Sequence, residues 1–246
     1  MKLLQFISFA ASLTSFALAQ SFCNSAKHTG ANVRISTYSS SKVGSIGGKS
    51  YEMWADTGYN YADFYSDGSF YCNFYQAKDY LCRSGLSFDS TKTHKQIGHL
   101  YADYKVVKQG VSGVNYSFIG VYGWSRDPLI EYYIVDNWLS SSRPGDWVGN
   151  KKHGVYLIDG AYYTVYENTR TGPSIDGDRT FKQYFSIRDN AKSCGTIDIT
   201  AHFNQWEKLG MRLGKLHEAK VLGEAGSTGS GASGSVDFPY ARVYKK

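Results

Sequence analysis

The stretch DPLIEYYIVDNW, residues 127–138, predicts a β-strand and indicates the fold class of the whole chain. β-Branched and aromatic residues dominate it, and Pro128 stands at its start, where a strand tolerates proline. Because side chains alternate between the two faces of a strand, Glu131 shares a face with Leu129 and Tyr133. A carboxylate in such apolar surroundings is costly to desolvate unless something compensates it. Glu131 is therefore a candidate functional residue.

The same strand pattern recurs along the chain. Aromatic residues make up 16% of it, and short alternating runs lie between turn signals. The dipeptides Asp67-Gly68 and Asp159-Gly160 are typical of hairpin turns. The alternating runs are found at residues 50–56, 62–75, 115–124, 156–170 and 182–189.

Helical spacing is confined to two segments, residues 93–100 and 200–211, and Thr200 is the candidate N-cap of the second. The Gly/Ser-rich segment 223–235 is expected to be a loop before a final strand. We therefore expect an all-β fold, a β-jelly roll of two curved, packed antiparallel sheets with one α-helix.

The N-terminus has the features of a secretory signal peptide. Residues 1–19 combine an early lysine, an apolar run and the small-residue end Ala17-Leu18-Ala19. A membrane anchor is the alternative, but the apolar run is short and interrupted by polar residues. We expect a secreted, extracellular protein whose residues 20–246 form one domain.

The charge pattern argues against some partners. The net charge is +6, yet the basic residues are scattered rather than clustered, so we expect no nucleic-acid partner. No later segment is apolar enough to span a bilayer, so we expect no membrane partner.

The even number of cysteines in a secreted chain predicts disulfide bonds. The four cysteines allow three pairings. Cys72 and Cys82 flank a span that could form a hairpin, so we predict that they pair and that Cys23 pairs with Cys194. A zinc site is the alternative, but there is no CxxC pair and the histidines lack ligand spacing. We expect neither a metal nor an organic cofactor. Asn115-Tyr116-Ser117 is a glycosylation sequon.

A second carboxylate lies in similar surroundings to Glu131. Glu224 follows the strand-like pair Val221-Leu222 and precedes the Gly-rich segment. Two carboxylates among apolar and aromatic residues suit glycoside hydrolysis, where one must be ionised and the other must hold a proton. Aromatic side chains can stack on sugar rings, although buried tyrosine is also ordinary core.

Longer motifs carry a family resemblance. YSFIGVYGWSRDPLIEYYIVDNW (116–138) resembles the nucleophile strand of the family 11 glycoside hydrolases, which are β-1,4-xylanases. The similarity continues in order through residues 172–188, 196–214 and 221–238. Residues 80–93 and 144–154 resemble the members secreted by anaerobic gut fungi. The resemblance covers nearly all of the chain after the predicted signal peptide.

This resemblance implies a jelly roll shaped like a partly closed right hand and retaining hydrolysis of internal bonds in xylan. It implies that Glu131 is the nucleophile and Glu224 the general acid/base. We place Tyr122 and Tyr133 on the strand of Glu131 and expect Pro173, with Ser174 and Ile175, at the tip of a thumb hairpin. The implied substrate-binding residues are Trp54, Tyr122, Tyr133, Arg170, Pro173 and Gln183.

Two further acidic residues stand out against the family pattern. Asp79 matches the position that contacts the acid/base, and an aspartate there implies an acidic pH optimum. Glu218 stands where many members have a cleft tyrosine, and it could raise a neighbouring pKa or pair with Lys220. The expected partner is xylan, and we expect a monomer. A glycan-binding jelly roll without catalysis and a related β-1,4-glucanase are the alternative functions.

Overall fold

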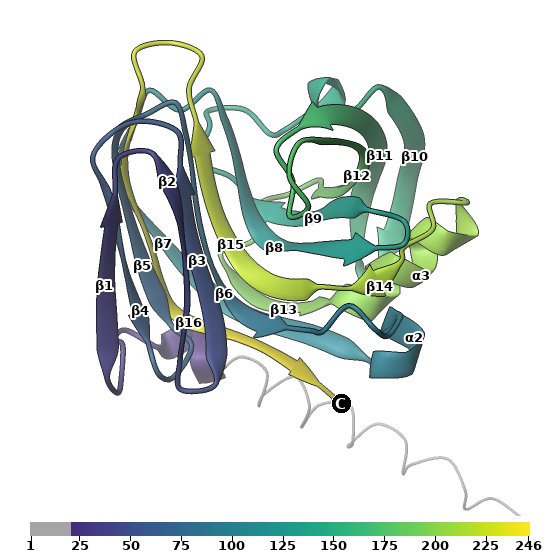
Figure 1. The fold of residues 1–246 in the computed structure, drawn as a ribbon, viewed down its shortest axis with the longest axis horizontal. Helices are drawn as coiled ribbons and strands as arrows, with labels where there is room; N and C mark the ends of the chain where they lie inside the picture. Colours follow the sequence, from purple (N-terminus) through teal and green to yellow (C-terminus); the bar gives the residue numbers. More distant parts are fainter. Residues whose placement is uncertain (1–20) are drawn as a thin grey trace, which may run out of the picture.

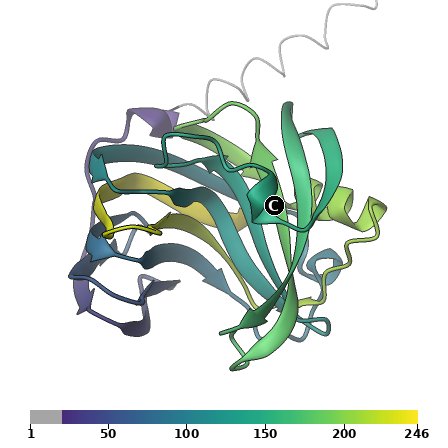
Figure 2. The ribbon, with the colours of Figure 1, turned by 90° about the horizontal axis from the view of Figure 1, so that it is seen from above.

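A computed structural model describes residues 21–246, and the predicted signal peptide, residues 1–19, lies outside them. The described chain forms two curved sheets, and the larger one bends from β2 and β3 towards β10 and β11 (Figure 1). The view from above shows the strands curved rather than flat (Figure 2). The predicted all-β jelly roll is confirmed.

The six-stranded sheet has the order β1 (Asn32–Thr37), β4 (Asn60–Tyr65), β5 (Phe70–Ala77), β16 (Ala232–Lys245), β7 (Leu100–Ser112) and β13 (Cys194–Asp198). The ten-stranded sheet has the order β10 (Lys151–Ile158), β11 (Ala161–Gly172), β12 (Arg179–Arg188), β9 (Ile130–Asn137), β8 (Tyr116–Arg126), β15 (Glu218–Gly226), β6 (Asp79–Ser87), β3 (Lys49–Ala55) and β2 (Ser40–Ile46), with β14 (Lys215–Leu216) paired to β8. Strands β9 and β12 run parallel, while the other pairs within residues 21–246 are antiparallel.

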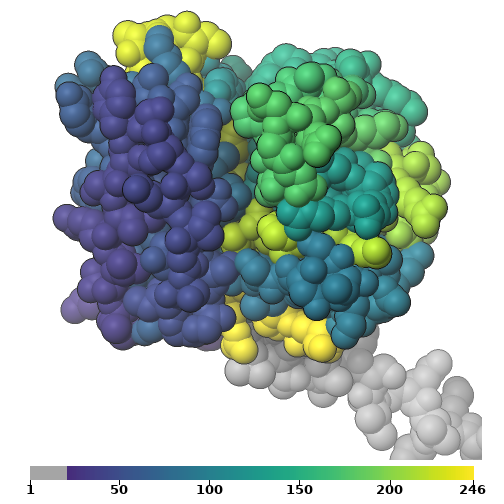
Figure 3. All heavy atoms as spheres, viewed as in Figure 1, coloured from purple at the N-terminus to yellow at the C-terminus, as the bar shows by residue number. Residues whose placement is uncertain are grey.

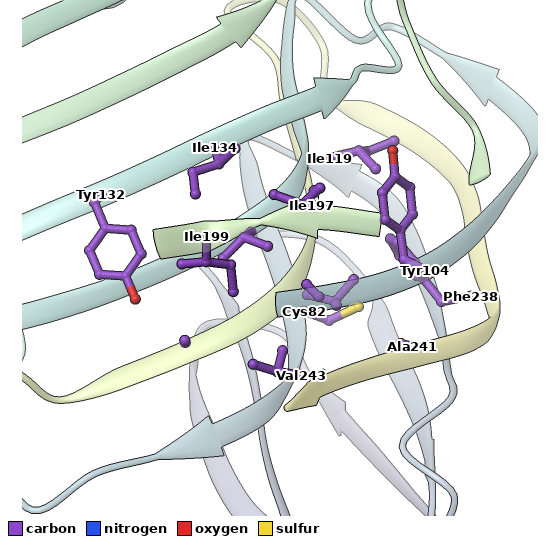
Figure 4. Close-up of a cluster of buried hydrophobic side chains, with 14 of the residues drawn as sticks. Cys82, Tyr104, Ile119, Tyr132, Ile134, Ile197, Ile199, Phe238, Ala241 and Val243 are labelled. Atoms are coloured by element: carbon purple, nitrogen blue, oxygen red, sulfur yellow. The ribbon is translucent and has the colours of Figure 1, made fainter. Parts of the chain in front are cut away.

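Strand β9, within residues 127–138, places its side chains alternately on its two faces. Tyr132 and Ile134 lie in the main core, on the side that faces Ile197 and Ile199 (Figure 4). Tyr133, on the opposite side, belongs to a second cluster on the concave face of the large sheet. One face of β9 therefore stabilises the fold, and the other carries Glu131 towards the concave side.

The main helix, α3 (Ile199–Lys208), packs behind the large sheet, where Trp206 Nε1 donates to Ser186 Oγ on β12 at 2.9 Å. Asp198 is its N-cap and accepts a hydrogen bond from the Ala201 amide at 2.8 Å. The prediction of Thr200 as N-cap is wrong, because Thr200 is buried inside the helix and its hydroxyl accepts from the Leu100 amide. In the described residues the remaining helical elements are the single turn α2 (His94–Ile97) and the 3₁₀ turns η1 (Ser21–Asn24) and η2 (Asp146–Val148).

The predicted turn at Asp159-Gly160 is confirmed, whereas the Gly-rich segment only partly forms the predicted loop. Asp159 and Gly160 join β10 to β11 with positive φ angles of 49° and 73°, as a type I′ hairpin requires. The Gly-rich loop is shorter than predicted, because β15 continues to Gly226 and β16 begins at Ala232. Glycine is required at Gly226, where a Cβ would collide with the ring of Tyr116.

Both predicted disulfides are present, Cys23–Cys194 and Cys72–Cys82. The predicted hairpin between Cys72 and Cys82 is wrong, because β5 and β6 belong to different sheets. This bond therefore links the two layers of the jelly roll. Within residues 21–246 no helix is both long and apolar enough to cross a membrane.

Candidate active site

A cleft of about 480 Å³ lies on the concave face of the large sheet. Figure 3 shows the hollow between the purple-blue strands and the green segment that contains β11 and β12. Eight of the residues predicted for the site line the cleft: Trp54, Asp79, Tyr122, Glu131, Tyr133, Arg170, Pro173 and Glu224. Arg170 lines it from an exposed position near the end of β11.

Glu131 is buried and held by three donors. Its Oε1 accepts hydrogen bonds from the hydroxyls of Tyr122 at 2.7 Å and Tyr133 at 3.2 Å. Its Oε2 accepts one from Gln183 Nε2 at 2.5 Å, so Gln183 lies in the site although it does not line the cleft. Asn168, which the sequence did not indicate, orients Gln183 by donating to its Oε1 at 2.7 Å. These contacts fix the direction of the Glu131 carboxylate.

Tyr122 reaches Glu131 from a neighbouring strand. The prediction that it shares the strand of Glu131 is wrong: Tyr122 lies on β8, and the antiparallel register places it opposite Tyr133 on β9. The reversal of the chain between the two strands brings the two tyrosines together. Trp124 Nε1 donates to the Tyr122 hydroxyl at 2.5 Å, which orients that hydroxyl in turn.

Glu224, on β15, has a different environment. It is 4% exposed, and its Oε2 has no hydrogen-bond partner among residues 21–246. Burial raises the pKa of Glu224 well above its ordinary value, and the negative charges of Asp79 and Glu131 raise it further. A carboxyl with such a raised pKa keeps its proton at pH values at which an ordinary glutamate is ionised.

Asp79 begins β6 and lies among other acids. Burial and the negative charge of Asp56 raise the pKa of Asp79 to about 7, against the opposing effects of Tyr116 and Arg170. The cleft therefore holds several carboxyl groups whose environments differ, which is the arrangement that general acid/base chemistry needs.

The predicted thumb tip, Pro173-Ser174-Ile175, lies in the turn between β11 and β12 and lines the cleft. Asp176 in the same turn binds Arg126 at the end of β8, with Arg126 Nη2 2.7 Å and Nε 2.9 Å from its Oδ1. The sequence did not indicate this pair, because the two residues are fifty positions apart and nothing local links them.

Glu218 belongs to a group of charged side chains in the cleft wall. It pairs with Lys220 at 2.6 Å, as one of the two expectations had it, and also lies 3.3 Å from Arg83. Burial alone would raise the pKa of Glu218, but the Arg83 and Lys220 cations outweigh it and lower that pKa. Arg83 in turn pairs with Glu52 at 2.6 Å. Neither Arg83 nor Glu52 was singled out from the sequence.

Comparisons with known proteins identify the family of the chain and similar structures. The model of "Glycosyl hydrolases family 11" matches residues 46–236. The chain is 72% identical to endo-1,4-beta-xylanase A of Piromyces sp over 92% of its length, and 70% identical to endo-1,4-beta-xylanase C of Neocallimastix patriciarum over 99%. It spans only 36% and 50% of the lengths of these two relatives.

Solved structures are similar over most of the chain. The crystal structure of wild-type ENZbleach xylanase superposes with a TM-score of 0.81 at 35% identity, and the match covers 92% of this chain and 91% of the other. Because the family model matches more than half of the sequence, the chain belongs to glycoside hydrolase family 11.

Proposed function

We propose that the chain is an endo-1,4-β-xylanase unit that hydrolyses internal β-1,4-xylosidic bonds with retention of configuration. The observation that carries the proposal is the pair Glu131 and Glu224 in one cleft. The first is held by three hydrogen-bond donors, and the second is buried with one carboxyl oxygen that has no hydrogen-bond partner in the described part of the chain. The xylanase names of the relatives support the substrate.

In the proposed first step, a Glu131 oxygen attacks the anomeric carbon while Glu224 gives its proton to the leaving glycosidic oxygen. The carbon–oxygen bond to the leaving sugar breaks as the bond to Glu131 forms. In the second step, Glu224 removes a proton from water, and that water displaces Glu131 from the anomeric carbon. The raised pKa of Glu224 suits the donor role, and the donors around Glu131 suit a nucleophile fixed in direction.

The remaining site residues are proposed to bind and orient the sugar chain. Trp54 offers a ring for stacking against a xylosyl unit, and the thumb tip at Pro173 closes over the chain. Tyr122, Tyr133 and Gln183 hold the nucleophile, while Arg170 contributes a cation at the cleft edge.

The cellular setting follows from the sequence features. We propose that residues 1–19 are a signal peptide, that residues 20–246 form the catalytic domain and that the protein acts outside the cell as a monomer. Asp79 is proposed to adjust the pH dependence of Glu224.

The experiment compares reducing-sugar release from xylan and from carboxymethyl cellulose for the wild type, Glu131→Gln and Glu224→Gln. We expect release from xylan only, and a loss of at least about 10³-fold in both variants with folding retained. Release from cellulose instead would make the chain a glucanase. Binding of xylan by the folded wild type without any release would make it a glycan-binding module.

A further inference from the structure

The cleft wall contains a buried cation that the proposed mechanism does not use. We propose that Arg83 is a positioning residue for Glu131, acting through the ring of Tyr122. This inference rests on the proposed function, because it assigns Arg83 a part in the reaction of Glu131.

The contact between Arg83 and Tyr122 is a cation over an aromatic face. Arg83 Cζ lies 4.4 Å from the centroid of the Tyr122 ring, and both side chains are almost completely buried. The hydroxyl at the edge of that ring donates to Glu131 Oε1 at 2.7 Å. A cation at this distance is attracted to the ring face, so it restrains the ring and hence the hydroxyl. The positive charge also makes the hydroxyl a better donor.

Arg83 is itself held from two neighbouring strands. Its Nη2 lies 2.6 Å from Glu52 Oε2 on β3 and 3.3 Å from Glu218 Oε1 on β15. Lys220 completes the group with its 2.6 Å contact to Glu218. Two cations and two carboxylates sum to zero formal charge. The positive charge of Arg83 is therefore balanced within the buried group.

Kinetics can separate a positioning role of Arg83 from a substrate-binding role. Arg83 lines the cleft, and its guanidinium covers the Tyr122 ring. A residue that binds sugar directly changes KM, and a residue that orients the nucleophile changes kcat. The two roles therefore predict different kinetics.

The test is a double-mutant cycle with Arg83→Met and Tyr122→Phe, assayed on xylan. In the wild-type background we expect Arg83→Met to lower kcat by about tenfold and to change KM by less than about twofold, because a hydrogen bond to a charged group is weakened. In the Tyr122→Phe background, which lacks the hydroxyl, we expect Arg83→Met to change kcat by less than about twofold. Arg83→Lys should restore part of the kcat, since it keeps the charge but not the planar stack.

A control variant outside the cleft tests whether the loss of an arginine–tyrosine contact by itself lowers kcat. Arg34 has the same kind of contacts outside the cleft, with Cζ 4.5 Å from the Tyr61 ring and a pair with Asp63. Arg34→Met should leave kcat unchanged. If Arg83→Met does not fold, the neutralised variant Arg83→Met/Glu52→Gln replaces it in the cycle.

Three kinetic results would overturn the proposal. A rise in KM with unchanged kcat would make Arg83 a substrate contact. Equal losses from Arg83→Met in both backgrounds would show that it does not act through Tyr122, and an equal loss in Arg34→Met would show that the effect is not specific to the cleft.

Failure of the xylanase assignment is distinguishable from failure of this inference. A crystal structure of Arg83→Met shows the position of the Tyr122 hydroxyl whether or not the wild type cleaves xylan. We expect that hydroxyl to lie farther from Glu131 Oε1 in the variant than the 2.7 Å of the wild type. An unchanged distance would contradict the positioning role even if the wild type is an active xylanase.

Discussion

The proton on Asp79 decides whether Glu224 has a neutral or a charged neighbour. The pKa of Asp79 is raised to about 7, so this carboxyl is neutral in acid and becomes charged as the pH rises through that value. A charged Asp79 opposes the negative charge that forms on Glu224 when it gives up its proton. We therefore predict an acidic optimum that moves to higher pH in Asp79→Asn, measured as kcat/KM for xylan from pH 4 to 9. An unchanged profile would contradict this role.

The same residue links stability to pH. Between pH 3.8 and about 7 the folded protein binds the Asp79 proton and the unfolded chain does not. The contribution of Asp79 to the unfolding free energy therefore falls as the pH rises through this window. We predict that the melting temperature of Asp79→Asn, relative to that of the wild type, increases from pH 4 to pH 7. Each kcal/mol of unfolding free energy corresponds to about 2–4 °C in melting temperature. A difference in melting temperature that is constant with pH would refute the linkage.

At the scale of elements, the thumb turn is held to the end of β8 by one ion pair. Arg126 binds Asp176 through Nε and Nη2, and the pair is partly exposed. We predict that Arg126→Ala raises KM for xylan by about two- to fivefold but lowers the unfolding free energy by only about 0.5 kcal/mol. Hydrogen exchange in the turn should become faster, since its anchor is lost.

Lys215→Ala is the control for this prediction, because it removes an ion pair with Asp127 at the same end of β8 without touching the thumb. Its KM should stay at the wild-type value. Equal effects of the two variants would assign the change to the end of the strand rather than to the thumb.

At the scale of the whole molecule, two disulfides close loops of very different length. Cys23 and Cys194 are 171 positions apart, whereas Cys72 and Cys82 are 10 apart. The chain-entropy relation then predicts losses on removal of about 5 and about 3 kcal/mol respectively. Denaturant unfolding of the two double-alanine variants measures both values. A larger loss for Cys72–Cys82 would show that its place in the core outweighs loop entropy.

Local pattern was sufficient for the two faces of β9, the Asp159-Gly160 turn and the presence of the main helix. Alternation in residues 127–138 separates Glu131 and Tyr133 from Tyr132 and Ile134, and the structure divides them in the same way. The Asp159-Gly160 turn could also be predicted from the sequence, because the backbone angles of a two-residue hairpin turn select particular residues. The helix N-cap was misplaced by two residues, since Asp198 and Thr200 are both good caps and only burial decided between them.

The sequence by itself determined the all-β class and the strand that carries Glu131, and through resemblance it indicated the candidate residues of the site. Only the tertiary structure decided which strands became neighbours: Tyr122 opposite Tyr133, and Arg83 between Glu52 and Glu218. The physical reason is the sequence separation over which each effect acts. Periodicity and turn chemistry act over a few residues, whereas strand order and sheet curvature bring together side chains that are 31 to 135 positions apart, as Arg83 is from Glu52 and Glu218.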